Sequence, residues 1–154
     1  MIADLYEWLL FGHIVGAMVW VGGLATLTLL SMQVRRSGEP DAIGRFVRSL
    51  RAIGPALLAP AVVLVFVLGV WMVGDSAAWD LGQRWVRIAL VLFAVAFLVG
   101  AVFQSRTALL AQRAVSSSDY AEAARQLRRW SWGMGVILVL LLVIAWDMVF
   151  KPGI

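Results

Sequence analysis

Four long apolar segments constrain what this chain can fold into. They lie near residues 5–32, 53–73, 85–103 and 130–150 of the 154 residues. About 20 apolar residues suffice to cross about 30 Å of hydrocarbon. Inside a bilayer such a segment must satisfy its own backbone hydrogen bonds, which an isolated strand does not do. We therefore expect an all-α polytopic membrane protein, a four-transmembrane-helix bundle that forms one integral domain.

The composition excludes several classes of protein and site. Hydrophobic residues make up 62% of the chain and charged residues 14%, more apolar surface than a soluble domain of this size can bury. Cysteine is absent, which excludes disulfides, thiolate metal sites, iron–sulfur clusters and cysteine nucleophiles. The chain starts with Asp4 and Glu7 rather than with a basic region, so we expect the first apolar segment to be retained as an anchor and not cleaved as a signal peptide.

The basic residues are distributed unevenly between the two sides of the predicted bundle. Ten of the thirteen lie in the links at residues 33–52 and 104–129, and three lie on the other side. The positive-inside rule places these links in the cytoplasm and both chain ends outside it. We expect an N-out/C-out, multi-pass protein of the bacterial cytoplasmic (inner) membrane, whose basic residues contact the lipid bilayer and give no indication of nucleic-acid binding. The ten residues are Arg35, Arg36, Arg45, Arg48, Arg51, Arg106, Arg113, Arg125, Arg128 and Arg129.

Local signals predict the shape of the second link and the positions of most tryptophans. Residues 116–118 are three serines, and Asp119 followed by Glu122 resembles a capping box, so we expect a helical hairpin. Pro55 and Pro60 predict a bend where the second span begins. Seven tryptophans fall near the span ends, as an aromatic belt at the membrane boundaries requires. They are Trp8, Trp71, Trp79, Trp85 and Trp146 at the outer boundary and Trp130 and Trp132 at the inner one.

The first span carries the features that most concern function. His13 is the only histidine, and it lies about 12 Å inside the outer helix end. His13, Gly16, Trp20 and Gly23 fall at helical spacing on roughly one face. Small residues let another helix approach closely, so we expect this glycine-rich face to support a homo-oligomer or contact within a larger membrane complex.

Three interpretations of His13 are open. A neutral imidazole could be hydrogen-bonded to a neighbouring backbone carbonyl or to a serine or threonine side chain, and serve packing alone. It could instead be the axial ligand of haem b, with Gly16 and Trp20 lining the slot and Arg84 and Arg87 binding the propionates. The third interpretation is a copper site, because imidazole and the Met18 thioether suit Cu(I). A second haem ligand would be Met18, Met72, Met148, water or His13 of another subunit.

Asp147 is a carboxylate within the last apolar segment. Pairing with Arg87, or with Lys151 four residues later, would make it tolerable there. A proton-relay or substrate-facing role beside His13 is the alternative. The sequence contains no serine-histidine-aspartate arrangement, phosphate-binding loop or paired carboxylate motif, which argues against hydrolytic and nucleotide-dependent enzymes. The sequence thus favours a non-enzymatic role, and any catalysis would be that of an oxidoreductase.

The pattern His13-x6-Trp20-x-Gly22-Gly23 resembles the bacterial copper-resistance-D-like (CopD-like) membrane proteins. Pro55, residues 69–71 and Trp85 extend the likeness to a branch of four-helix proteins known only as a domain of unknown function. The resemblance implies copper uptake or tolerance, as in CopD. More distantly it implies haem binding, as in the HemJ-type protoporphyrinogen oxidases, which share a first-helix histidine. HemJ-like proteins carry a lysine where this chain has Arg87, and arginine pairs with a propionate but does not serve as a base.

Three functions are therefore open. The first is a CopD-like membrane protein that binds b-type haem through His13 for haem handling or electron transfer. The second is transport of copper or a small solute, with His13, Met18 and Asp147 near the path. The third is a cofactor-free helper subunit of a membrane complex.

Overall fold

The computed structural model describes residues 5–76 and 78–151, and every regular element in them is helical. The chain forms four helical rods long and apolar enough to span a membrane, because two of the rods continue through a short π-helical segment. The four-helix architecture expected from the sequence is confirmed. The elements are α1 (Leu5–Ser37), α2 (Pro40–Ile53), η1 (Gly54–Leu58), α3 (Ala59–Asp75), α4 (Arg84–Leu98), η2 (Val99–Gln104), α5 (Ser105–Ser116) and α6 (Tyr120–Phe150).

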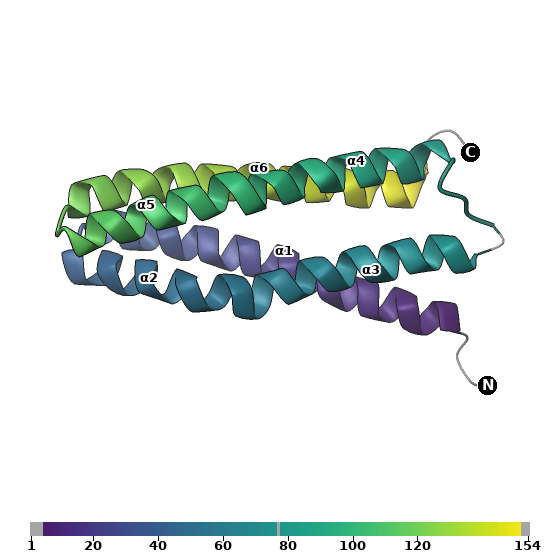
Figure 1. The fold of residues 1–154 in the computed structure, drawn as a ribbon, viewed down its shortest axis with the longest axis horizontal. Helices are drawn as coiled ribbons and strands as arrows, with labels where there is room; N and C mark the ends of the chain where they lie inside the picture. The colour runs from purple at the N-terminus through teal and green to yellow at the C-terminus, as the bar shows by residue number, and fades with distance from the viewer. Residues whose placement is uncertain (1–4, 77, 152–154) are drawn as a thin grey trace.

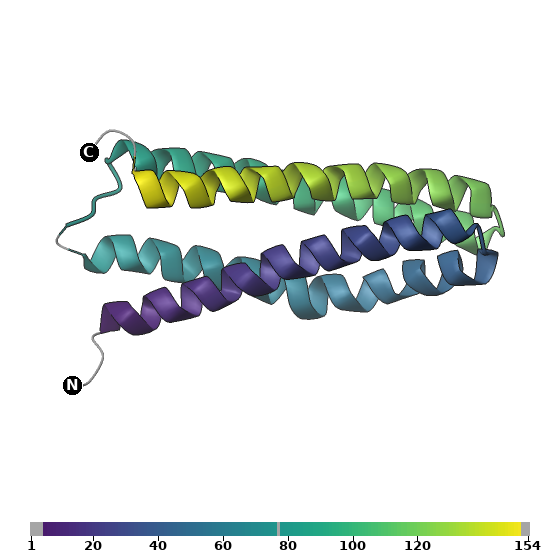
Figure 2. The same cartoon turned by 180° about the vertical axis from the view of Figure 1, so that it is seen from behind.

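The rods pair as two long helical hairpins that lie side by side (Figures 1 and 2). One hairpin is α1 with α2, η1 and α3, and the other is α4, η2 and α5 with α6. The start of α1, the end of α6 and the connection between α3 and α4 lie together, and we call this the terminal end. The tight turns after Ser37 and Ser116 lie at the opposite end. The ten arginines of the two links belong to the helices that lead into and out of these turns, so we call this the arginine-rich end.

The first link is shorter than the sequence analysis expected. Residues 33–52 were predicted as a link between spans, yet α1 continues to Ser37 and α2 begins at Pro40. Gly38 adopts a φ of +68°, the left-handed conformation in which glycine commonly ends helices. Proline is well suited to the first turn that follows, because that position needs no amide donor. The second link does form the predicted hairpin, with the Asp119 carboxylate accepting from the Glu122 amide at 2.9 Å.

The best-buried core lies in the half toward the arginine-rich end. Leu24 and Val47 are fully enclosed there, packed with Leu127 from α6. A hydrogen bond of 2.9 Å joins the buried hydroxyls of Ser31 and Ser131, and so ties α1 to α6. Interhelical hydrogen bonds of this kind hold helices together where lipid offers no polar alternative.

The glycine-rich face of α1 packs inside the chain, against α3 and η1. A Cβ atom added to Gly12 would come within 2.8 Å of Leu68, and one added to Gly23 would come equally close to Leu58. At Gly16 a Cβ would lie 3.0 Å from Val65. The expectation that this face joins two copies of the chain is therefore wrong, because the second rod already covers it.

The aromatic belt is only partly as expected. Trp8, Trp71, Trp132 and Trp146 are exposed on the outside of the bundle, where boundary tryptophans belong. Trp85 and Trp130 are buried, so placing them in the belt was wrong. Each of these two rings lines a cavity between the rods.

Candidate functional site

His13 lines a cavity of about 440 Å³ in the terminal half of the bundle. All four rods contribute to the wall, which is almost entirely apolar. Tyr6 and Leu81, at its rim, are exposed, so the cavity opens at the surface. Its size and lining fall within the range of small-molecule and cofactor sites, which combine apolar walls with a few polar groups.

The imidazole of His13 is held by α3. Its Nδ1 lies 2.8 Å from the carbonyl oxygen of Val65. A carbonyl oxygen only accepts hydrogen bonds, so this bond requires the proton on Nδ1 and leaves Nε2 of the neutral ring with a free lone pair. Gly69, one turn further along α3, provides the space, since a Cβ there would lie 3.0 Å from His13 Cε1.

This arrangement agrees both with a packing histidine and with a histidine that ligates haem or copper. The backbone hydrogen bond expected of a packing histidine is present. The same bond is also how proteins usually orient a ligating histidine, because an Nδ1 proton held by a carbonyl fixes the tautomer and directs Nε2 outward. Nε2 makes no hydrogen bond within the described chain, where the imidazole bonds only through Nδ1.

A cluster of aromatic rings closes the inner side of the cavity. Trp20 packs edge-on against Phe93 with ring centroids 5.7 Å apart, and Phe93 stacks on Phe66 at 5.1 Å. Trp20 therefore lines the cavity, as the sequence analysis expected. The ring also borders a second cavity nearer the arginine-rich end, so it separates the two spaces.

The cation at this cavity is Lys151, whereas the sequence analysis expected Arg84 and Arg87. Both arginines are exposed at the start of α4 and do not line the cavity. Lys151 follows α6 in a left-handed conformation with a φ of +44°, and its side chain lines the cavity. Its Nζ lies 3.6 Å from the centre of the Trp79 ring. Contact with an aromatic face stabilises an ammonium group near an apolar space.

Two methionines share the cavity with His13, and neither is Met18. Met72 of α3 and Met148 of α6 line it, whereas Met18 is 67% exposed on the outside of α1. Gly16 also lies outside the lining and packs on Val65. Within residues 5–76 and 78–151 no three histidine, cysteine, aspartate or glutamate side chains group as a metal site. Met72 and Met148 could therefore add thioether sulfurs to the imidazole nitrogen of His13 at a metal.

Asp147 is buried without the ion pair expected from the sequence. It is 1% exposed, and its Oδ2 atom has no hydrogen-bond partner among the described residues. Among the described residues, the ion pair present joins Arg125 to Glu122, far from Asp147. Lys151 bonds to Asp147 through its backbone amide, while its ammonium group lies over Trp79. The proposed pairs of Asp147 with Arg87 and with Lys151 are therefore wrong.

Replacing Asp147 by asparagine is expected to stabilise the protein by about 1–2 kcal/mol. An unpaired buried carboxylate costs more free energy than an amide of nearly the same shape, because the amide carries no charge. Thermal unfolding in detergent at pH 8 measures the difference. Asp41→Asn, at an exposed position, is the matched control and is expected to change little. Destabilisation by Asp147→Asn would show that the carboxylate has a partner in the membrane-embedded protein.

A comparison with protein families places the whole bundle in one family. The family described as "Predicted integral membrane protein (DUF2269)" matches residues 7–152, which include His13 and all four rods. The chain belongs to the DUF2269 family. No curated protein and no solved structure matches the chain. Membership in DUF2269, together with the four long apolar helices, identifies an integral membrane protein.

Several cavity residues were not among the site residues proposed from the sequence. Gly69, a glycine in a span and so a point where another group can approach closely, was part of the family resemblance but was not proposed as a site residue. Lys151 was considered only as a partner for Asp147, yet it is the single lysine and follows the last span directly. Phe66 and Phe93 gave no signal, because both lie in uniformly apolar sequence.

Proposed function

We propose that this protein binds a b-type haem in the cavity beside His13, with Nε2 of His13 as an axial ligand, and that it serves haem handling or electron transfer. The observation that carries the proposal is the bond from Nδ1 to the Val65 carbonyl, because it leaves Nε2 free for a ligand. The resemblance of the first span to CopD-like and HemJ-like proteins supports it. We place the terminal end outside the cytoplasm of a bacterial cell, following the distribution of arginines.

The other residues of the cavity fit this group. Trp20, Phe66 and Phe93 form an apolar, aromatic wall against which a porphyrin ring could pack. Met72 and Met148 offer a thioether as a second axial ligand, in the combination of histidine and methionine known from cytochromes. Lys151 offers the cation that a propionate needs at the mouth of the cavity. When bound, haem would supply one-electron chemistry, and the role of these residues is to hold it and exclude water.

Copper binding is the second candidate, and the two methionines favour it. His13 with Met72 and Met148 provides one imidazole nitrogen and two thioether sulfurs around one cavity. Soft ligands of this kind select Cu(I). This set replaces the pair of His13 with Met18, which the fold does not bring together.

Visible spectra of the detergent-purified protein test the haem proposal. The protein is measured as isolated, after dithionite reduction and after supplying haem. We expect a Soret band and sharp reduced α and β bands, which His13→Ala removes and added imidazole restores by filling the vacated slot. Because His13 is the only histidine, no other imidazole of the chain can replace it. Met18→Ala is the matched control on the same helix and is expected to leave the spectrum unchanged.

Two outcomes would overturn the haem proposal. One is the absence of any haem band even with haem supplied, and the other is a band that His13→Ala does not change. Metal analysis of protein loaded with Cu(I) then separates the remaining functions. Copper retained by the wild type and lost in Met72→Ala and Met148→Ala would support copper binding. Neither haem nor copper would leave a cofactor-free helper role.

A further inference from the structure

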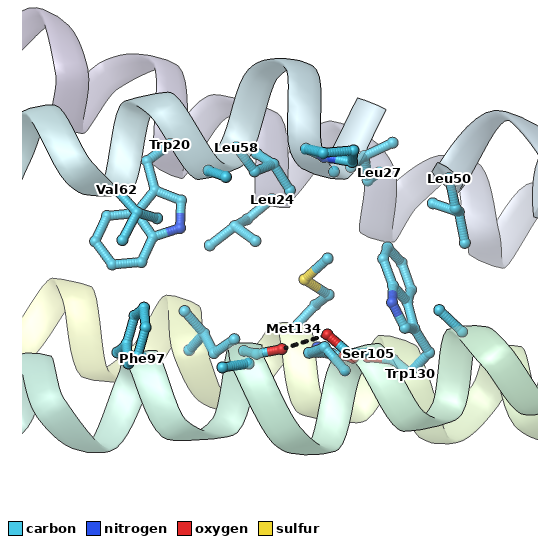
Figure 3. A pocket seen from close by; sticks show the side chains of 18 of the residues that line it. Trp20, Leu24, Leu27, Leu50, Leu58, Val62, Phe97, Ser105, Trp130 and Met134 are labelled. Atoms are coloured by element: carbon cyan, nitrogen blue, oxygen red, sulfur yellow. Dashed lines mark hydrogen bonds between the residues drawn. The ribbon is translucent and has the colours of Figure 1, made fainter. Parts of the chain in front are cut away.

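A second cavity of about 510 Å³ lies toward the arginine-rich end of the bundle (Figure 3). It separates the α2, η1 and α3 rod from the α4, η2 and α5 rod. No Cα atom of α3 comes within 8 Å of one of α4, so these spans leave a gap that the cavity fills. Val63 and Phe97 line the cavity and are 60% and 50% exposed. The cavity therefore opens sideways, toward the lipid.

The deep end of this cavity is apolar. Trp20 closes it within the membrane, and Leu24, Val62 and Phe97 form its walls (Figure 3). The bilayer core holds no water to fill such a space, and an empty void would deprive the lining of van der Waals contacts. An acyl chain of the adjoining lipid matches this lining, and it reaches the space through the gap between α3 and α4.

The other end of the cavity reaches the depth of the lipid head groups. Arg51 lies 24 residues before Asp75 on the second rod, which corresponds to about 36 Å of helix. Trp130 lies 20 residues before Phe150 on α6, which corresponds to about 30 Å. The hydrocarbon layer is about 30 Å thick, and a polar layer of about 5–8 Å follows it on each side. Trp130 therefore lies at the boundary of these layers, and Arg51 lies in the polar one.

Arg51 gives this end of the cavity a positive charge. Of the ten link arginines, all of which the structure describes, Arg51 alone lines the cavity, and it lies exposed at the rim. The ion pair present in the described chain joins Arg125 to Glu122, so the Arg51 guanidinium is left for an external anion. Among the described residues no acidic side chain lines the cavity. An anionic phosphate would be attracted here, whereas the ammonium group of a zwitterionic lipid would find no partner.

Trp130 adds an unused hydrogen-bond donor at the same end. Its indole nitrogen lies on the cavity side of the ring (Figure 3). In the described chain the indole that donates a hydrogen bond is that of Trp85. The Trp130 nitrogen is not among the fully enclosed polar atoms that lack a partner, so it is accessible from open space. Buried indole N–H groups usually have an acceptor. A glycerophospholipid carries ester carbonyls, which only accept, just below its phosphate.

Both π-helical segments of the protein border this one cavity. Pro55 lies in η1, where its missing amide hydrogen interrupts the regular helical ladder. On the facing rod, η2 contributes Gly100, and a Cβ added there would meet only Ile137, at 3.9 Å. The absence of a side chain at Gly100 thus keeps the space open. Single π turns inside α-helices occur frequently at functional sites.

We propose that this cavity binds one anionic phospholipid from the leaflet on the arginine-rich side, which enters from the bilayer between α3 and α4. The phosphate pairs with Arg51, an ester carbonyl accepts from the Trp130 indole, and one acyl chain fills the apolar end. The second acyl chain stays in the bilayer, because the cavity is open on the side of Val63 and Phe97. This proposal does not depend on haem binding at His13.

Native mass spectrometry of the full-length protein, released from a neutral detergent with short-chain probes, tests the proposal. The probes are dioctanoyl phosphatidylglycerol, dioctanoyl phosphatidylethanolamine and decanoate. We expect phosphatidylglycerol to bind about fivefold more tightly than phosphatidylethanolamine, because the two differ in net charge at Arg51. Decanoate is expected to bind more weakly than phosphatidylglycerol, since it has no ester carbonyl for the Trp130 indole.

Variants of the chain complete the test. Arg51→Gln is expected to weaken phosphatidylglycerol binding about fivefold, to the level of phosphatidylethanolamine. Arg45→Gln is the matched control, because Arg45 is exposed on the same helix and does not line the cavity. It is expected to keep the preference. Gly100→Leu fills the cavity without a clash of its Cβ, so we expect it to abolish phospholipid binding and to leave thermal unfolding unchanged.

Several results would overturn the proposal. They are equal binding of the two phospholipids by the wild type, a preference that survives Arg51→Gln, and undiminished binding in Gly100→Leu. Tighter binding of decanoate than of phosphatidylglycerol would assign the cavity to a fatty acid, and it would overturn the proposal as well. His13→Ala is expected to leave phospholipid binding intact even where it removes the haem spectrum. The haem and phospholipid proposals therefore fail separately.

Discussion

Gly69→Leu is expected to abolish haem binding as completely as His13→Ala, although Gly69 itself has no group that could ligate iron. A Cβ atom at this position would lie 3.0 Å from Cε1 and 3.3 Å from Nδ1 of His13. The imidazole cannot keep its place with a leucine there, so its bond to the Val65 carbonyl is lost. Without that bond neither the tautomer nor the direction of Nε2 is fixed. Reduced visible spectra after supplying haem measure the effect.

A graded series and a matched control make this prediction specific. Gly69→Ala adds only the Cβ, and we expect a weakened and shifted spectrum because the ring must move by a few tenths of an ångström. Gly74 lies on the same helix, and an added Cβ there would have no atom within 4 Å. We therefore expect the Gly74→Leu variant to bind haem normally. A normal spectrum from Gly69→Leu would mean that the position of the imidazole is irrelevant, and it would count against His13 as the ligand.

The architecture could be predicted almost completely, because hydrophobic length alone decides it. A segment of about 20 apolar residues in lipid has to be helical and has to cross. The length of α2 was missed, although its signal was present. Ile43, Val47 and Leu50 recur at i, i+4 and i+7, and all three are buried in the structure. This amphipathic pattern within a polar, arginine-rich link indicates a helix that packs on the bundle.

Only those residues of the site that are unusual in the sequence could be predicted. His13 is unique, so it was found, and Trp20 follows from its spacing on the same face. The residues that complete the cavity come from three other rods, and which side chains meet depends on tertiary packing. The cation at the cavity shows this most clearly, because Arg84 was expected there and Lys151 lies there instead. The left-handed conformation of Lys151 places its ammonium group over the Trp79 ring, and no pattern in the sequence predicts that conformation.

The glycines of α1 show why a small-residue motif does not predict which helix packs against it. Small residues at regular spacing indicate that some helix approaches closely, and that expectation is correct. A helix that is apolar nearly all round carries little information about which side faces lipid and which faces protein. The contact with α3 could therefore not be told from a contact with another copy. The structure decides it, because Leu58, Val65 and Leu68 already occupy this face.

Gly16→Leu is accordingly expected to act on the fold of the single chain. A Cβ at Gly16 would lie 3.0 Å from Val65, 3.3 Å from Leu64 and 3.6 Å from the backbone oxygen of Ala61. The contacts with Val65 and Leu64 are already tight for the Cβ alone, and the remaining atoms of a leucine side chain would enlarge the clash, so α1 has to move away from α3. Overpacking of this kind costs about 1–3 kcal/mol. We expect lower thermal stability in detergent and, because Val65 is displaced from His13, weaker haem binding as well.

Gly22→Leu is the control for this substitution. The comparison distinguishes packing of the glycine-rich face against α3 from contact of that face with a second copy of the chain. Gly22 is exposed on the same helix, and an added Cβ meets no atom within 4 Å. We expect its stability to stay within about 0.5 kcal/mol of the wild type. If the glycine-rich face joined two copies, Gly16→Leu would lower the mass measured by light scattering and leave the unfolding of the single chain unchanged. Packing against α3 predicts the reverse, because the cost then arises within each chain whatever its oligomeric state.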